Sequence, residues 1–389
     1  MIILCEPQCE GFEHVEVNSA LLRFIRYAFA DEKIIFLAER HHLEQVQKNA
    51  LDAQLDNIEY QTINIPARHS SNLKRQLDEY SLCKMVFNIA KQKNVQKILF
   101  CSVTSPGLIA IKLLLRIFKQ IKVVVIPHSI LEQITQRPSL KPWKYIYWIK
   151  VPMVLANNDQ IRYLLLGQSI KEQIENLFPS LEHYISSIHL PYKFEYFEKS
   201  IATFKDVISF GSFGVGHRGK GTELLFKMAE EIKQLRLNHK VVFMLIGPIV
   251  ENYIRSLQSE SVVTPSPDEP MSREEFSSFA KAVDYAVFFY KPTSYRFTAS
   301  GALFDAFSYV KPIIAIKNPY FEYYFKIMGD IGYLCDNYEE MKAIIVGILE
   351  NPPTERYQAQ CQNILQAREQ LKAEKMVGSI AGLWGAREK

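Results

Sequence analysis

The sequence contains no long hydrophobic run, no close cysteine pair and no strong excess of charge of either sign. No apolar stretch reaches the roughly 18 residues of a membrane-spanning helix. The first residues lack the basic and apolar segments of a signal peptide. The six cysteines form no CxxC pair and no Cys/His cluster at zinc spacing. We therefore expect a cytoplasmic protein with reduced thiols and no structural zinc.

The charge balance makes two further classes unlikely. Lysine and arginine number 46 against 42 acidic residues, and the net charge of +4 is spread along the chain, so nucleic acid is not an expected partner. No DxD-like acidic pair is present to hold Mg²⁺ at a pyrophosphate. We therefore expect neither a metal ion nor a cofactor. A chain of 389 residues that is 48% apolar can fill the cores of two domains.

Short β-branched runs recur along the chain, and each is followed by a longer segment with helical spacing. The runs are continuously apolar rather than alternating, which is typical of parallel strands that are covered on both faces. This pattern predicts an α/β protein with two tandem doubly wound, Rossmann-like domains and a cleft between them. We expect a first domain over 1–190, a linker over 191–206 and a second domain over 207–370. A final helix over 371–389 either stays with the second domain or crosses back to the first.

A glycine-rich loop, "FGSFGVGHRGKGTELL" at 210–225, follows a predicted strand and precedes a predicted helix. Glycines let the backbone approach a phosphate, the helix N-terminus orients N–H groups, and basic side chains add positive charge. The loop lacks the spacing of GxGxxG or GxxxxGK[ST], so a flexible surface loop with solvated bases remains an alternative. We predict an anion-binding loop that includes Gly214, Gly216, Arg218 and Lys220.

A second loop, "YKPTSYRFTASGALFDAF" at 290–307, also lies between a strand and a helix. Ser300 is a natural N-cap, and Gly301 leaves the first helical turn open, so that backbone amides there face a diphosphate. Asp305 lies one turn further on, where it can accept hydrogen bonds from a ribose. The alternative is an ion pair of Asp305 with Lys311 or Arg296. The predicted nucleotide contacts are Tyr290, Thr293, Ser294, Ser300, Gly301 and Asp305.

The order of these motifs resembles the donor side of GT-B fold glycosyltransferases, particularly the retaining family-four-like group. "SGALFDA" followed by "KPIIAI" is similar to that group's acid–Ala pair and Gly-x-Pro-Val-Ile-Ala, and the glycine-rich loop is similar to its Gly-Arg-Leu…Lys-Gly stretch. "VVVIPH" is similar to its strand ending in His, so the resemblance covers most of the chain. Two positions depart from the pattern: the first acid of the Glu-x7-Glu pair falls on Phe297, and the Arg of Gly-Arg falls on Ser212.

The resemblance implies a glycosyltransferase that moves a sugar from an NDP-sugar to an acceptor hydroxyl without a metal ion. It implies diphosphate contacts from Lys220, Arg218, Ser300 and Gly301, and a ribose contact from Asp305. The commonest setting would be bacterial surface polysaccharide or glycolipid synthesis, with a glycan or a lipid-linked acceptor. An NDP-sugar epimerase, or an inactive nucleotide-sugar-binding protein that lacks the first acid, remains an alternative.

The loop after the first predicted strand is expected to bind the acceptor. Glu13 or His14 could deprotonate an acceptor hydroxyl there; alternatively both are solvated, and Asn18 or Ser19 caps the following helix. His128 ends another strand, where the resemblance implies contact with the donor sugar or its phosphate, and the alternative is a hydrogen bond to a loop. The predicted catalytic residues are therefore Glu13, His14 and His128.

Lysines and aromatic residues are interleaved over 140–152, "LKPWKYIYWIKVP". This composition fits the headgroup zone of an anionic membrane, which would bring the protein to the inner face of the membrane. It equally fits a helix that packs its aromatic face into the core with its lysines reaching outward.

Overall fold

The chain divides into two compact units, each described here by itself. The computed structural model describes residues 1–50, 55–67, 72–128, 130–136, 145, 147–194, 206–235, 237, 240–291, 294–380 and 382–384. Unit 1 comprises Met1–Lys193, Phe297–Ala299 and Leu371–Lys389, and unit 2 comprises Phe194–Arg296 and Ser300–Gln370.

Unit 1 is built on a seven-stranded parallel sheet in the order β3-β2-β1-β4-β5-β6-β7. Most of its strand residues are buried, as expected for strands covered on both faces. The strands are β1 Ile2–Cys5, β2 Ile34–Ala38, β3 Ile58–Thr62, β4 Lys97–Phe100, β5 Lys122–Val125, β6 Ile161–Leu165 and β7 Ile185–Ser187.

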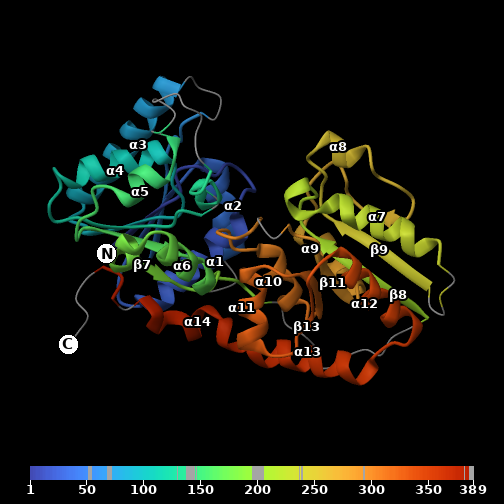
Figure 1. The fold of residues 1–389 in the computed structure, drawn as a ribbon. Coiled ribbons are helices and arrows are strands. Elements are labelled where there is room, and N and C mark those ends of the chain that lie inside the picture. Colours follow the sequence, from blue (N-terminus) through green and yellow to red (C-terminus); the bar gives the residue numbers. More distant parts are fainter. Residues whose placement is uncertain are drawn as a thin grey trace. The chain divides into compact units, whose positions relative to one another are not determined.

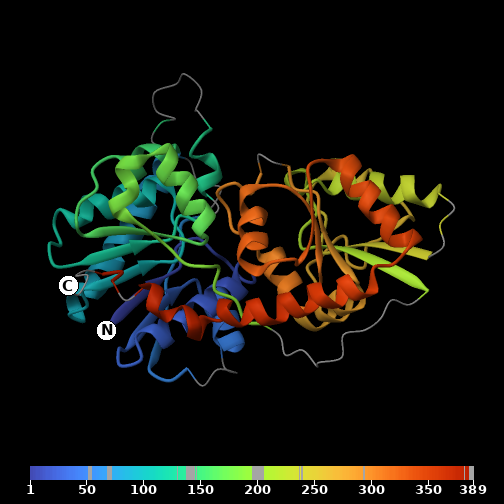
Figure 2. The same cartoon turned by 60° about the horizontal axis from the view of Figure 1, so that its bottom comes forward.

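The helices of unit 1 form two groups. In one, α4 packs against α3 and α5; in the other, α1 packs against α2 and against the C-terminal α14 and η7 (Figures 1 and 2). The segment after Leu371 therefore belongs to unit 1. The helices and 3-10 turns are α1 Val15–Ala28, α2 Arg40–Ala50, α3 Asn72–Gln92, α4 Ser105–Leu115, η2 Ile130–Gln133, α5 Lys150–Val154, α6 Gln168–Leu177, η4 Pro179–Tyr184, α14 Ala373–Met376 and η7 Val377–Ile380.

Unit 2 has a six-stranded parallel sheet in the order β10-β9-β8-β11-β12-β13. The strands are β8 Val207–Phe213, β9 Lys240–Ile246, β10 Val262–Val263, β11 Tyr285–Phe288, β12 Ile313–Ile316 and β13 Gly332–Cys335. The helices and 3-10 turns are η5 Arg218–Lys220, α7 Thr222–Lys233, α8 Asn252–Arg255, α9 Arg273–Ala282, α10 Gly301–Ser308, α11 Pro319–Met328, α12 Tyr338–Glu350, α13 Thr354–Arg368 and η6 Glu369–Leu371.

Two parallel sheets with helices between successive strands confirm the predicted pair of Rossmann-like domains. The strand order reverses between β1 and β4 in unit 1 and between β8 and β11 in unit 2. Open α/β sheets bind ligands beyond the carboxyl ends of their strands at such switch points. A ligand site is therefore expected at the loops that follow these four strands.

The fold bears on the expectations about membrane-spanning helices and about the cysteines. Within the described ranges, no helix combines the length and apolarity needed to cross a bilayer. All six cysteines are buried, and burial raises the pKa of Cys5 and Cys101 well above the usual thiol value. The thiols of Cys5 and Cys101 are therefore protonated and unreactive in the core.

Candidate functional site

Unit 1 has a cavity of about 360 Å³ beside the carboxyl ends of β1 and β4, at its switch point. Polar and apolar side chains both line it. The polar ones are Glu6, Gln8, Glu13, His14, Asn18, Ser102 and His128. The others are Cys9, Val17, Leu21, Cys101, Ile126, Leu166 and Pro191.

The three residues predicted to be catalytic, Glu13, His14 and His128, all line this cavity. His14 directly precedes α1 in a left-handed conformation with φ of 51°. Its ring meets that of His128 edge to face, with centroids 5.1 Å apart and an interplanar angle of 86°. The structure thus brings together side chains from two loops that are more than a hundred residues apart in sequence.

The two imidazoles do not have equivalent surroundings. His128 is only partly exposed, and desolvation of its ring, aided by the nearby His14, lowers its pKa to about 3. The ring is therefore neutral at pH 7 and is a weak base, although it can still donate and accept hydrogen bonds. His14 and Glu13 are exposed beside the start of α1, so a ligand in the cavity can reach both side chains.

Sequence reasoning missed Glu6, which directly follows β1 and is only 1% exposed. Its Oε1 accepts hydrogen bonds from the backbone N–H groups of Gln8 at 2.9 Å and Cys9 at 3.2 Å, and from the hydroxyl of Ser102. Its Oε2 accepts from Asn18 Nδ2 at 3.2 Å. An acid at the end of an apolar strand on the switch-point side was the signal available in the sequence.

A buried histidine continues this network behind the cavity. Asn18 Nδ2 lies 2.9 Å from His42 Nε2, and His42 Nδ1 lies 3.1 Å from the carbonyl oxygen of Gly11. The pattern fits a neutral ring with its proton on Nδ1, and burial lowers the pKa of His42 accordingly. The network thus ties α1, α2 and the loop after β1 together.

The expected capping role of Asn18 or Ser19 is wrong. Both residues lie inside α1 and are buried. The N-cap is His14, and it makes no side-chain capping hydrogen bond. The helix begins at Val15, so Asn18 and Ser19 fall within its first two turns.

In unit 2, the backbone of the glycine-rich loop adopts conformations that depend on glycine. Gly214 and Gly221 have φ of 78° and 67°, conformations that favour glycine. A Cβ on Gly221 would lie 2.2 Å from the carbonyl oxygen of Phe289. Gly216 forms a parallel bridge with Ile249. The conformation of this loop therefore requires glycine at these positions, and its role as an anion-binding loop stays a prediction.

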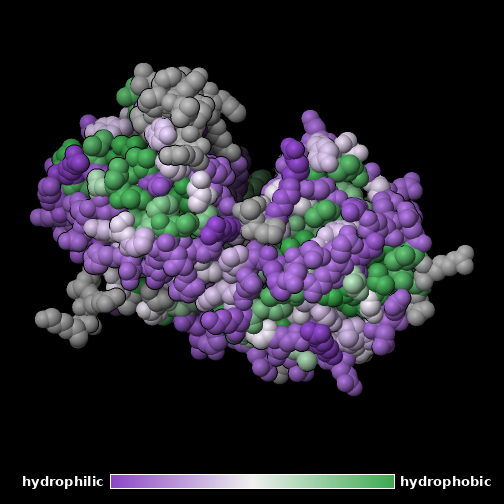
Figure 3. Space-filling view, viewed as in Figure 1, coloured by the Kyte–Doolittle hydropathy of each residue, from purple (hydrophilic) through white to green (hydrophobic). Residues whose placement is uncertain are grey.

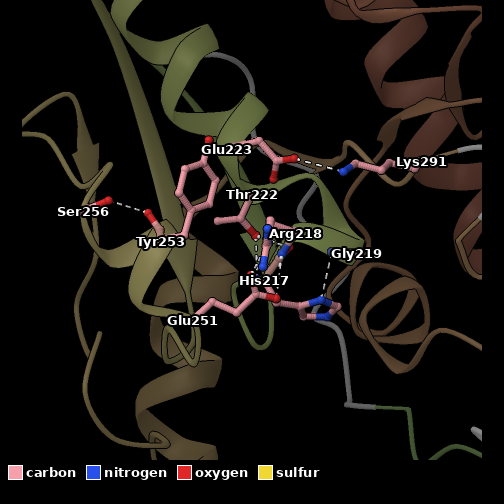
Figure 4. A network of polar contacts seen from close by, with 9 residues as sticks. All are labelled: His217, Arg218, Gly219, Thr222, Glu223, Glu251, Tyr253, Ser256 and Lys291. Atoms are coloured by element: carbon pink, nitrogen blue, oxygen red, sulfur yellow. Dashed lines mark hydrogen bonds and ion pairs between the residues drawn. The ribbon is translucent and has the colours of Figure 1, made fainter.

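Side chains of the same loop also make polar contacts within unit 2, as Figure 4 shows. His217 Nδ1 accepts a hydrogen bond from the N–H of Gly219 at 3.1 Å. Arg218 Nε lies 2.8 Å from Glu251 Oε2, and its guanidinium carbon is 5.4 Å from the ring centroid of Tyr253 (Figure 4). Arg218 thus already has an anionic partner. Its positive charge would be divided between Glu251 and any bound phosphate.

Lys220 is the less exposed of the two predicted phosphate-binding bases. Its Nζ donates to the carbonyl oxygen of Phe213 at 2.9 Å, at the carboxyl end of β8. Burial lowers its pKa to about 8, an effect opposed by the negative charge of Asp305. The ammonium therefore lies near Asp305 and is mostly protonated at pH 7.

Asp305 has an ion-pair partner that the sequence did not indicate. Its Oδ1 is 2.9 Å from Nη1 of Arg273, the first residue of α9. Of the two partners considered from the sequence, Lys311 donates its Nζ to the carbonyl oxygen of Lys281 at 2.9 Å. The carboxylate thus lies among two cations, Arg273 and Lys220, with a net positive charge for the three groups.

The start of α10 confirms one prediction and refines another. Ser300 is the N-cap, and its Oγ accepts from the N–H of Leu303 at 3.3 Å. A Cβ on Gly301 would find no atom within 4 Å, so the space in front of the first turn is open. Tyr290 is buried, and its hydroxyl lies 3.1 Å from Ser300 Oγ, so it supports the cap rather than presenting a ring to solvent.

The remaining predicted nucleotide contacts lie between β11 and α10. Thr293 lies outside the described residues. Ser294 donates its N–H to the carbonyl oxygen of Lys291 at 2.8 Å. Tyr295, which follows, stacks on Tyr290 with centroids 4.1 Å apart.

Phe297 occupies the position where the resembling group has its first acid. The side chain is 3% exposed and belongs to unit 1, where its N–H donates to Glu132 Oε1 at 2.8 Å. Its ring helps to line a small apolar pocket beside His128. A buried phenyl ring cannot supply the missing carboxylate.

Part of the aromatic segment 140–152 can be placed. Residues 140–144 and 146 lie outside the described residues. Trp148 Nε1 donates to the carbonyl oxygens of Gln133 and Ile134 at 3.0 and 3.1 Å. The Tyr147 hydroxyl accepts from Gln76 Nε2 at 2.6 Å. Both side chains are half-buried and hydrogen-bonded within unit 1, and the two interpretations of the segment stay predictions.

Within the part of the chain that the structure describes, no group of three His, Cys, Asp or Glu residues is arranged to hold a metal ion. That no cofactor and no metal take part remains a prediction.

Comparisons with known proteins identify the fold. No family model and no curated protein sequence matches the chain. Solved structures do: WaaG, "a glycosyltransferase involved in lipopolysaccharide biosynthesis", aligns with a TM-score of 0.63 and 11% identity over 99% of both chains. The lipopolysaccharide outer core galactosyltransferase WaaB gives 0.60 and 13% over 97% of both chains. Arabidopsis thaliana UGT89C1 complexed with UDP-L-rhamnose gives 0.57 and 10% over 99% of both chains. The chain has the fold of the GT-B glycosyltransferases.

Proposed function

We propose that the protein is a glycosyltransferase that moves a sugar from an NDP-sugar to an acceptor hydroxyl. Unit 2 holds the nucleotide, and the cavity of unit 1 holds the acceptor. One observation carries the proposal: the Lys220 ammonium, the open N-terminus of α10 and the Asp305 carboxylate lie together at the switch point of unit 2. Cations, oriented N–H groups and one carboxylate are what a nucleoside diphosphate requires.

The proposed chemistry follows from these charges. The acceptor oxygen bonds to the anomeric carbon while the bond from that carbon to the diphosphate breaks, and the electron pair leaves with the diphosphate. Lys220 and the N–H groups at Ser300 and Gly301 stabilise the negative charge that develops. These groups take the part that a divalent cation plays elsewhere, so the proposed reaction needs none. The acceptor proton passes to Glu13 or His14 at the cavity of unit 1.

The proposed setting is bacterial surface polysaccharide or glycolipid synthesis on the inner face of the membrane. Two structural neighbours are described as lipopolysaccharide enzymes, which supports this choice. A glycan or a lipid-linked glycan would then be the acceptor.

Peripheral membrane contact is better supported by α4 and α5 than by the aromatic segment. Leu113, Ile117 and Leu155 are exposed by 44%, 68% and 60%, and Figure 3 shows apolar side chains gathered over these helices. No Asp or Glu occurs between residues 103 and 131, whereas the same stretch carries Lys112, Arg116, Lys119 and Lys122. An apolar surface with bases around it fits an anionic lipid surface.

Vesicle co-sedimentation tests this contact. Ile117→Glu is expected to weaken binding to anionic vesicles, with little binding of any variant to neutral vesicles. Leu235→Glu, at an exposed apolar position of unit 2, is the matched control and should bind like the unchanged protein. Equal binding of all three proteins would remove the membrane contact from the proposal.

A panel of UDP-, GDP-, ADP- and CMP-sugars tests the donor site by thermal shift. A ligand at about 100 times its dissociation constant stabilises the folded state by about 2.7 kcal/mol, which is readily measured. We expect one nucleotide class to raise the melting temperature, and Asp305→Ala to reduce the shift. No shift with any member, in a protein that melts cooperatively, would contradict the proposed function.

A further inference from the structure

The cavity of unit 1 has a one-sided charge. Glu6 and Glu13 both line it, and among its described lining residues none is lysine or arginine. The sequence accentuates this asymmetry, because the first 22 residues carry Glu10 and Glu16 as well and contain no lysine or arginine. The carboxylates of Glu6 and Glu13 therefore give a ligand in the cavity a negative potential, which the N-terminal end of α1 offsets only in part.

The buried member of this pair, Glu6, is held in place by hydrogen bonds. It accepts them from two backbone N–H groups, the Ser102 hydroxyl and the Asn18 amide. All four donors are neutral groups, so none of them cancels the charge. The neighbouring ring of His128 is neutral as well, because desolvation lowers its pKa to about 3.

A second negative charge in the cavity would be repelled. Two unit charges about 7 Å apart, at an effective dielectric constant of about 20, repel each other enough to weaken binding roughly 50-fold. A neutral ligand incurs no such penalty, and an ammonium group is attracted by a comparable amount. Val17, Leu21, Ile126 and Leu166 also line the cavity and offer apolar contact to a ring face.

We propose that the acceptor residue that enters this cavity is a sugar without negative charge, either neutral or amino-substituted, and that phosphorylated and carboxylated sugars are rejected there. A cavity of about 360 Å³ accommodates a sugar residue or two. This inference rests on the proposed function, since it describes the acceptor of that reaction. In a lipid-linked acceptor, the phosphates must then lie outside the cavity.

Ligand-observed NMR on the full chain, without donor, tests the inference. The probes are methyl glycosides in the gluco and galacto configurations, each as the neutral hexoside, the 2-amino-2-deoxyhexoside, the uronate and the 6-phosphate. We expect the neutral or amino form of at least one configuration to bind, and its uronate and 6-phosphate to bind at least tenfold more weakly.

A charge added to the lining provides the matched comparison. Gln8→Lys introduces a cation beside Glu6 and should narrow the gap between the neutral and anionic sugars by about tenfold or more. Leu235→Lys adds the same charge on unit 2 and should leave the gap unchanged. Circular dichroism and a cooperative melt establish that each variant is folded.

The outcomes separate this inference from the proposed function. Anionic sugars that bind as well as neutral ones, or no binding by any probe, would overturn the inference, whatever the donor panel shows. A failed donor panel together with selective binding of neutral or amino sugars would overturn the transferase and leave the cavity as a site for such sugars.

Discussion

Replacement of Lys220 by methionine is expected to weaken donor binding strongly. The substitution keeps an unbranched stem but removes the ammonium, which lies 2.9 Å from the carbonyl oxygen of Phe213. A hydrogen bond to a charged group contributes about 1.5–3 kcal/mol. The dissociation constant for a nucleoside diphosphate should therefore rise roughly 10- to 150-fold. The control is Arg218→Met: its guanidinium is exposed and already paired with Glu251, so its loss should cost less.

The pKa of Lys220 adds a pH signature to this prediction. Burial lowers that pKa to about 8, and a bound diphosphate favours the protonated form, so the pKa must rise on binding. Affinity should therefore be level below pH 8 and fall by up to about tenfold per pH unit above it. Isothermal titration of the protein with nucleoside diphosphate from pH 6.5 to 9.5 measures both effects. The reasoning is refuted if Lys220→Met binds within twofold of the unchanged protein, or if it keeps the same decline above pH 8.

Three further substitutions test individual parts of the structure. Gly301→Ala should leave the free energy of unfolding unchanged or raise it by up to about 1 kcal/mol, since the added Cβ meets no atom within 4 Å. The same substitution should weaken nucleotide binding in a titration. Unchanged affinity would mean that no phosphate approaches that turn. Gly221→Ala should destabilise the fold by roughly 3 kcal/mol or more, because its φ is 67° and its Cβ would lie 2.2 Å from the carbonyl oxygen of Phe289, and an unchanged melting temperature would contradict the loop geometry. Glu6→Gln should cost about 1–3 kcal/mol in urea unfolding, since an amide nitrogen cannot accept the hydrogen bonds that one carboxylate oxygen accepts; a neutral effect would argue against the buried network.

The fold and the location of the candidate sites could be predicted from the sequence. Continuous β-branched runs that alternate with helical segments allow little besides parallel sheets. Parallel strands end at one edge of a sheet, so loops that follow successive strands must share that edge. This geometry is why the glycine-rich loop and the α10 N-terminus, read separately from the sequence, lie together in unit 2.

Side-chain partners could not be predicted in the same way. Arg273 pairs with Asp305 because α9 begins beside α10 in space, although 32 residues separate the two. The position of Glu6 after a strand was visible in the sequence, but its distant donors, Ser102 after β4 and Asn18 on α1, come to it only through the fold. Tyr290 follows a buried strand and precedes a loop, and its burial against Ser300 depends on where that loop turns.

The mass of the acceptor after reaction tests the proposed sugar transfer most directly. The protein would be incubated with the nucleotide sugar that stabilises it and with the sugar that binds the cavity of unit 1. The products would then be separated, and their masses measured by mass spectrometry. We expect an acceptor heavier by one sugar residue, free nucleoside diphosphate in equal amount, and much less of both products with Lys220→Met. Consumption of the nucleotide sugar at the same rate without acceptor, or a donor and an acceptor that both bind and yield no heavier product, would contradict it.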